Sequence, residues 1–170
     1  QYLDLNRDFI KADSKEALSF SAIFQECDPD VFIDNHVSNG ADYQHVMTLL
    51  TSQPSKLGGV MENFLRTKFE PALYAGMKEK GYDMIPYVNA YGDKPENGWS
   101  TYWDSPRYTS GYATLWNSFA FVPETHMLKP YDQRVMATLA LMENFIAFTG
   151  KNATEMQELR NKTKQAVVTA

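Results

Sequence analysis

The spacing of hydrophobic residues near the start of the chain predicts a helix that leads directly into a strand. The helix is expected to begin at Asp13, because Asp13 and Glu16 have the spacing of a capping box. It ends at Asp28-Pro29-Asp30, and the apolar run 31–33 that follows suits a buried strand. The predicted core-facing side of the helix carries residues at the i, i+3, i+4 and i+7 spacing: Phe20, Ile23, Phe24 and Cys27.

Farther along the chain, the same patterns predict more helices and two more strands. Helices are expected over 56–69, 71–81, 131–149 and 153–168, and strands over 84–88 and 118–122. Pro86 places the first of these strands at a sheet edge, because proline cannot donate to the strand ladder. The last helix is more polar and is expected to lie on the surface. The helix over 131–149 carries a hydrophobic stripe formed by Val135, Leu139, Met142 and Ile146.

This order of helices and short strands is the arrangement of an α/β protein. Between the elements, residues 90–111 are rich in Gly, Pro, Asn, Ser and aromatic residues. A long loop of this kind is more often a functional lid or rim than a spacer. Its side chains suit the rim of a ligand site, although such residues also pack ordinary loops. They are Trp99, Tyr102, Trp103, Arg107 and Tyr108, with Tyr112 close behind.

Length, composition and charge narrow the class of protein. The 170 residues suit one compact domain, and 44% of them are hydrophobic, which supplies a real core. The net charge of −5 argues against nucleic acid or an anionic membrane as the main partner. No apolar run is long enough to span a bilayer. The one cysteine, Cys27, excludes an internal disulfide and a Cys-rich zinc site, and its place on the apolar stripe predicts a core residue.

Two polar groups near the start of the chain suggest a site for a carboxylate. The guanidinium of Arg7 is a planar fork that can hold a carboxylate by two parallel hydrogen bonds. The amide of Asn6 can add a third. The alternative is an ordinary surface ion pair of Arg7 with Asp4 or Asp8.

Two further residues follow predicted strands, where ligands gather in open α/β sheets. His36 comes after the strand that begins at residue 31, two residues after Asp34, so it suits a metal ligand with a carboxylate nearby. Glu124 comes after strand 118–122 and can take a proton from a metal-bound water and deliver it to a leaving amine. The alternatives are a hydrogen-bonded histidine at a strand end and an acid at a helix start. His126 suits either a site or a structural role.

Three segments, in order, resemble the zinc carboxypeptidase family. Residues 4–9 resemble the Asn-Arg motif, although Asp8 stands where the family usually has Asn. Residues 30–36 resemble the strand that carries the third zinc ligand, and residues 121–125 the strand that holds the catalytic glutamate. The resemblance implies a three-layer α/β/α fold with a mostly parallel or mixed central sheet. It also implies a peptidase that removes residues from the C-terminus of a peptide by a metal-activated water.

The resemblance also assigns roles to individual residues. It implies that Asn6 and Arg7 grip the terminal carboxylate of a peptide, that His36 binds zinc, and that Glu124 is the base. It further implies a substrate-contacting tyrosine, which we expect to be Tyr108; Tyr102 and Tyr112 are the alternatives. Because the family is often exported, the resemblance implies a secreted or periplasmic protein.

One difference from the family pattern leads us to expect only part of a catalytic domain. The H-x-x-E pair of zinc ligands is absent, since none of the three histidines, His36, His45 and His126, has Glu three residues later. The family's upstream arginine, which stabilises the oxyanion, is absent as well. We therefore expect residues 1–170 to be the C-terminal portion of such a catalytic domain, inactive alone and without tightly bound zinc. The sheet would then lack strands on its N-terminal side, and a second copy of the chain could cover the open edge as a homodimer.

Two other functions remain open at this point. The same scaffold could carry an amidohydrolase that deacylates amino acids or trims cell-wall peptides. The chain could also be a non-catalytic module that binds peptide termini. An upstream sequence without H-x-x-E would favour the second of these.

Overall fold

A mixed five-stranded sheet forms the centre of the protein in the computed structural model, which describes residues 3–38, 42, 44–92 and 95–169. The strand order is β1-β7-β3-β4, and β2 also pairs with β7. Strand β7 runs parallel to β1 and β2 and antiparallel to β3, while β4 runs parallel to β3. The strands are β1 (Val31–Ile33), β2 (His36–Ser38), β3 (Met47–Thr51), β4 (Ile85–Pro86) and β7 (Phe119–His126).

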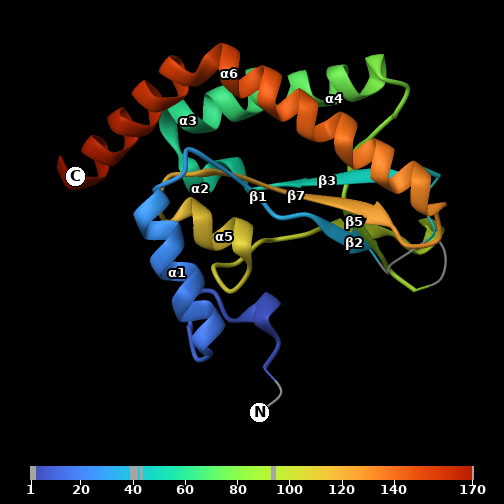
Figure 1. Cartoon of the computed structure of the whole chain (residues 1–170), viewed down its shortest axis with the longest axis horizontal. Coiled ribbons are helices and arrows are strands. Elements are labelled where there is room, and N and C mark those ends of the chain that lie inside the picture. The colour runs from blue at the N-terminus through green and yellow to red at the C-terminus, as the bar shows by residue number, and fades with distance from the viewer. Residues whose placement is uncertain (1–2, 39–41, 43, 93–94, 170) are drawn as a thin grey trace.

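Helices cover both faces of this sheet, which confirms the predicted α/β class and its three layers (Figure 1). One face carries α3 (Gly59–Phe64), the π-helical turn η2 (Leu65–Phe69), α4 (Glu70–Glu79) and α6 (Tyr131–Thr169). The other face carries α1 (Lys15–Cys27) and α5 (Thr109–Thr114). The remaining elements are η1 (Leu5–Arg7), α2 (Pro54–Leu57), η3 (Pro95–Asn97) and a two-stranded sheet of β5 (Val88–Ala90) and β6 (Trp99–Thr101).

Strand β7 is buried on both faces because a hydrophobic cluster lies on each. Phe119 and Phe121 belong to the larger cluster, under α3, α4 and α6, where Phe69 stacks on Phe148 at 4.3 Å between ring centroids. Ala120 belongs to the smaller cluster, under α1 and α5. Side chains alternate between the faces of a strand, so Val122 and Glu124 point to the same side as Ala120. That side is where the candidate site lies.

The first helix begins one residue later than the capping-box spacing predicts, and it turns a different face to the core. Ser14, not Asp13, is the N-cap, and its hydroxyl accepts the N–H of Ala17 at 3.0 Å. The predicted core residues Ile23 and Cys27 are wrong: Ile23 is 62% exposed and Cys27 lies on the surface. The buried positions are Ala17 and Phe24, because the sheet contacts a face of the helix rotated away from Ile23.

The two predicted C-terminal helices are one continuous helix, α6. Gly150 lies inside it and does not end it, because a glycine with its backbone hydrogen bonds intact only lowers helix stability by about 1 kcal/mol. The predicted stripe is mostly wrong, since Val135, Leu139 and Ile146 are exposed. The helix instead packs through Ala137, Leu141 and Phe145, and its second half buries Met156 and Arg160 rather than lying free on the surface.

The middle of the chain also differs from the prediction in three places. Positive φ angles at Gly58 and Gly59 divide the predicted helix 56–69 into the short α2 and a longer run of α3, η2 and α4. The predicted loop 90–111 contains strand β6 and most of α5. Strand β3 was not predicted, because a buried run of five residues has too little periodicity to identify it. Pro86 does lie in an edge strand, as predicted.

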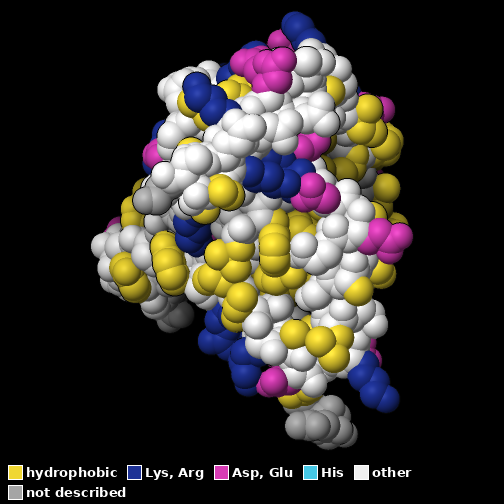
Figure 2. Space-filling view, turned by 90° about the vertical axis from the view of Figure 1, so that its left-hand side faces the viewer, with side chains coloured by type: hydrophobic (Ala, Val, Ile, Leu, Met, Phe, Trp, Pro, Cys, Tyr) yellow, Lys and Arg dark blue, Asp and Glu magenta, His cyan; other side chains and the backbone are white. Residues whose placement is uncertain are grey.

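Charged side chains of both signs are mixed on the face of the molecule shown in Figure 2. There they surround a central group of hydrophobic side chains.

In the part of the chain that the structure describes, no helix is both long enough and apolar enough to cross a bilayer.

Candidate active site

The register of β2 and β7 brings His36 and Glu124 together. The two residues are direct partners in this parallel pair, and His36 Nδ1 lies 3.7 Å from Glu124 Oε1. Pairing along β7 is interrupted between β1 and β2, at the level of Pro123, which has no N–H to donate. Asp34 lies in this interruption, where its side chain is free to contact groups outside the sheet ladder.

Asn6 and Arg7 reach the same place from η1, which precedes the first long helix. Asp8 anchors this segment: it is buried and accepts the N–H groups of Asp13 and Ser14 at 3.0 and 2.9 Å. Hydrogen bonds from Ser14 and Asp13 lower the pKa of the Asp8 carboxyl. The alternative of an ion pair between Arg7 and Asp4 or Asp8 is wrong, because Arg7 Nη1 donates to the carbonyl of Asn6, while Asp4 and Asp8 accept backbone N–H groups instead.

Two tyrosines from the aromatic loop hold the guanidinium of Arg7 in place. Arg7 Cζ lies 4.4 Å from the ring centroid of Tyr108, and the Tyr108 and Tyr102 rings meet edge to face at 5.0 Å. Burial and a hydrogen bond with Tyr108 raise the pKa of Tyr102. The other alternative, Tyr112, is buried in the smaller hydrophobic cluster instead.

An ion pair fixes the loop that carries these tyrosines. Asp104 is fully buried, and Lys56 Nζ lies 2.6 Å from its Oδ1. The same ammonium lies 4.6 Å from the ring centroid of Trp103. The loop is therefore tied to helix α2 on one side of Tyr102.

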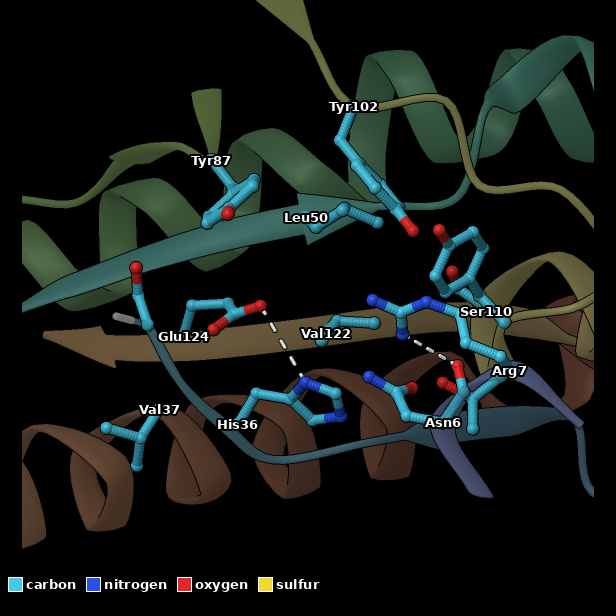
Figure 3. A pocket seen from close by; sticks show the side chains of 13 residues that line it. Asn6, Arg7, His36, Val37, Leu50, Tyr87, Tyr102, Ser110, Val122 and Glu124 are labelled. Atoms are coloured by element: carbon cyan, nitrogen blue, oxygen red, sulfur yellow. Dashed lines mark hydrogen bonds and ion pairs between the residues drawn. The ribbon is translucent and has the colours of Figure 1, made fainter. Parts of the chain in front are cut away.

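All of the predicted site residues line one pocket of about 330 Å³. In Figure 3 the guanidinium of Arg7 and the side chains of His36 and Glu124 point into the same space. The floor between them is apolar. Sequence reasoning missed other lining residues, because no local pattern shows which side chains turn toward the pocket: Leu50, Val122, Tyr87 and Ser110.

In the pocket, the pKa of Glu124 is raised whereas that of Asp34 is lowered. Burial raises the pKa of Glu124, although the neighbouring His36 opposes this, so the carboxyl holds a proton more readily than an exposed glutamate. Burial opposes ionisation of Asp34 too, but hydrogen bonds from His36 and Thr109 lower its pKa overall. The hydrogen bond to Asp34 raises the pKa of His36.

The described residues do not complete a zinc site. His36 Nδ1 lies beside Glu124 in the pocket and is one candidate ligand, but zinc sites generally use at least three protein ligands. Within residues 3–38, 42, 44–92 and 95–169, no group of three His, Cys, Asp or Glu side chains is placed to hold a metal. His126 is buried beyond the pocket, where Nδ1 accepts the N–H of Leu128, and His45 contacts the carbonyl of Asp83.

Comparison with known proteins supports the fold of the chain and does not identify a reaction. No model of a protein family matches the sequence, and no curated protein matches it. Among solved structures, the chain is similar to the crystal structure of a metallo-carboxypeptidase from Burkholderia cenocepacia, with a TM-score of 0.61 and 15% identity. The match covers 88% of this chain and 40% of that chain, so the chain spans well under half the length of its neighbour. At this identity the similarity shows the fold: the chain has a carboxypeptidase-like scaffold.

Proposed function

We propose that this chain supplies the substrate-carboxylate grip and the general base of a metallocarboxypeptidase-like site. The observation that carries the proposal is the convergence of Arg7, His36 and Glu124 on one pocket of the scaffold. These groups come from η1, β2 and β7, which lie far apart in the sequence.

Arg7 and Asn6 bind the free carboxylate of a peptide in this proposal. The guanidinium makes no ion pair with any carboxylate among the described residues, and its Nη1 donates only to the carbonyl of Asn6 at 2.8 Å. It therefore keeps donors for a ligand. Tyr108 holds the guanidinium plane, which lowers the entropy lost when a carboxylate binds. Hydrogen bonds to charged groups of this kind contribute about 1.5–3 kcal/mol each.

Glu124 acts on the peptide bond as a proton carrier. Its carboxylate accepts a proton from an attacking water and passes it to the leaving nitrogen, and the raised pKa of the carboxyl makes it a better base for this step. The ring of His36 lies beside it and forms one corner of the same space.

The metal is the part of the proposal that the chain does not provide alone. His36 offers one ligand, and a complete zinc site needs further ligands that the described residues do not bring to it. The chain on its own is then inactive and binds zinc weakly. Calorimetric titration with zinc tests this, because a tight site with one zinc per chain would contradict it.

Binding of a free carboxylate tests the proposal directly. An N-acylated dipeptide with a free C-terminal carboxylate should bind the chain, whereas the same dipeptide as its C-terminal amide should bind at least about tenfold more weakly. Calorimetry or NMR titration measures both. Equal affinity for acid and amide would contradict the proposed role of Arg7.

The incomplete metal site favours one second candidate, a non-catalytic module that binds peptide termini. Both candidates predict binding of the dipeptide acid, so hydrolysis must separate them. In a protein that joins this chain to an upstream H-x-x-E segment, release of the C-terminal amino acid by mass spectrometry would identify the peptidase. Binding without release, in a protein whose upstream segment lacks H-x-x-E, would identify the module.

A further inference from the structure

A chain of hydrogen bonds connects the tyrosine loop to the imidazole of the pocket. The Thr109 hydroxyl lies 2.5 Å from Asp34 Oδ2, and the same carboxylate oxygen lies 2.9 Å from His36 Nε2. The three residues come from the start of α5, from the gap between β1 and β2, and from β2. Thr109 is buried and directly follows Tyr108 in the sequence.

The chemistry of these groups fixes the direction of each hydrogen bond. The carboxylate of Asp34 can only accept, so both the Thr109 hydroxyl and His36 Nε2 donate to it. In the neutral ring, Nδ1 is then the nitrogen with the free lone pair. It is also the nitrogen that faces Glu124, at 3.7 Å. Partners of this kind commonly set the tautomer and orientation of a histidine that works in a site.

Thr109 is not needed by its own helix. The N-cap of α5 is Tyr108, which makes no side-chain capping bond, and the Thr109 side chain contacts Asp34 instead of a backbone N–H. Thr114 in the same helix shows the ordinary alternative, since its hydroxyl donates to the carbonyl of Gly111 within the helix. The Thr109 hydroxyl is thus directed to another element.

We propose that Thr109 is a positioning residue, which acts through Asp34 to hold His36 as the Nε2–H tautomer with Nδ1 turned to the pocket. The same contact couples the segment that carries Tyr108 to the orientation of the imidazole. The value of this arrangement for catalysis depends on the proposed function, but the hydrogen-bond chain itself does not.

The tautomer of His36 can be read from the ¹⁵N chemical shifts of its ring by NMR, in metal-free protein at a pH where the ring is neutral. The wild type should show almost only the Nε2–H form. Thr109→Val keeps the shape of the side chain and removes the donor, so the minor Nδ1–H form should rise at least about threefold. Thr109→Ser restores the hydroxyl and should restore the wild-type ratio.

Thr114→Val is the matched control, because it removes a buried hydroxyl from the same helix without touching Asp34. It should leave the ratio unchanged. Asp34→Asn is a second test that does not depend on Thr109, and it should also shift the tautomers. The proposal is overturned if Thr109→Val and wild type give the same ratio, or if Thr114→Val shifts it equally.

This result and the test of the proposed function can fail separately. The tautomer is measured without metal or ligand, whereas the carboxylate grip is measured by the affinity of the dipeptide acid over its amide. An unchanged tautomer in Thr109→Val with intact acid preference would overturn only the positioning role. A shifted tautomer without acid preference would overturn only the proposed function.

Discussion

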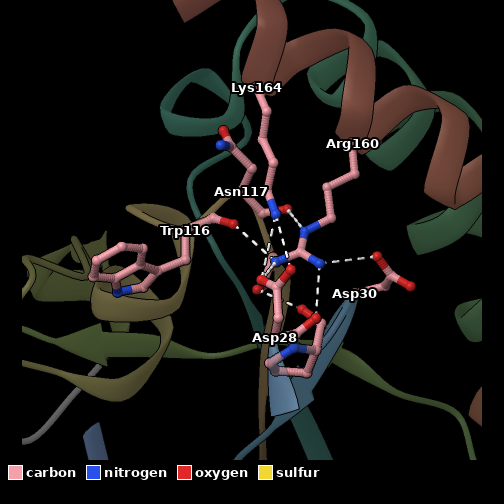
Figure 4. A network of polar contacts seen from close by, with 8 residues as sticks. Asp28, Asp30, Trp116, Asn117, Arg160 and Lys164 are labelled. Atoms are coloured by element: carbon pink, nitrogen blue, oxygen red, sulfur yellow. Dashed lines mark hydrogen bonds and ion pairs between the residues drawn. The ribbon is translucent and has the colours of Figure 1, made fainter. Parts of the chain in front are cut away.

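Two arginines in this protein have opposite surroundings. Arg160 in α6 is only 4% exposed, and its guanidinium is saturated by protein acceptors (Figure 4). It donates to the backbone carbonyls of Asp28, Trp116 and Asn117, and it pairs with the carboxylates of Asp28 and Asp30. These contacts join α6 to the end of α1 and to the turn before β7.

Arg7 has the same side chain but almost no protein acceptors. Its guanidinium contacts the carbonyl of Asn6 and the ring of Tyr108, and it points into the pocket. A guanidinium whose donors are all used by the protein stabilises the fold, whereas one that is held in place with donors to spare is available to a ligand. Sequence spacing does not distinguish the two cases, but the hydrogen-bond acceptors that the protein places around each guanidinium do.

The largest expected effect comes from removing the saturated arginine. Arg160→Met should lower the free energy of unfolding by about 3 kcal/mol, because it removes the hydrogen bonds of a buried guanidinium and leaves the carbonyls of Asp28, Trp116 and Asn117 without that donor. Urea denaturation measures the change. Arg66→Met is the control: Arg66 makes an exposed ion pair with Glu62, so its loss should cost about 0.5 kcal/mol. Equal costs for the two variants would contradict the distinction between them.

For Arg7 we expect the opposite result: a large effect on ligand binding and little effect on stability. Arg7→Met should leave the free energy of unfolding nearly unchanged, since the guanidinium pairs with no described carboxylate, and should weaken binding of the dipeptide acid about 50-fold. Calorimetric titration and urea denaturation together give both numbers. Arg107→Met is the matched control, because Arg107 is exposed and lies 5.9 Å from the same Tyr108 ring. A large loss of stability in Arg7→Met would show that it, too, is structural.

A smaller effect should appear in the pH dependence of stability. The raised pKa of His36 means that the folded protein holds the ring proton more tightly than the unfolded chain, because of Asp34 and despite the nearby Arg7. The stabilisation is complete below the ordinary pKa of histidine and is lost as pH rises through the folded value. Glu124 also faces the ring and favours its charged form.

His36→Gln should therefore flatten the decline in the free energy of unfolding as pH rises past neutrality. Urea denaturation at a series of pH values measures the decline. His45→Gln, outside the pocket, is the control and should keep the wild-type slope. The same slope in His36→Gln and wild type would contradict the assignment.

The smallest effect concerns the outer edge of the sheet. In the described part of the chain, β1 and β2 pair only with β7, and Val37 in β2 is 54% exposed. We propose that this edge pairs weakly with a second copy of the chain, and that Val37→Lys weakens self-association several-fold, as charged edge residues do. Sedimentation velocity measures this. Val167→Lys, at the end of α6, is the control, and a monomer at all concentrations would contradict the proposal.

The success of the sequence prediction differs from element to element for physical reasons. The strand at residues 31–33 was predicted because a short apolar run between polar residues is typical of a strand, although it is only half-buried rather than buried. The ends of the predicted strands differ from the structure: His36 begins β2, and Glu124 lies inside β7, which continues to His126. The stripe on α6 was not predicted correctly, because hydrophobic residues lie on two sides of that helix, and α3, α4 and the sheet cover only part of it. Arg160 lies in a segment expected to be polar surface, and no sequence pattern distinguishes a buried arginine from an exposed one.

The sequence by itself determined the α/β class, the order of the candidate side chains and the absence of an H-x-x-E pair, because these depend on local periodicity and residue identity. Only the tertiary structure decided that Arg7 keeps free donors while Arg160 keeps none, and that Thr109 contacts Asp34. Those outcomes depend on which acceptors are brought within hydrogen-bond distance by segments that are distant in the sequence. The separation of two residues along the chain does not give their distance in space.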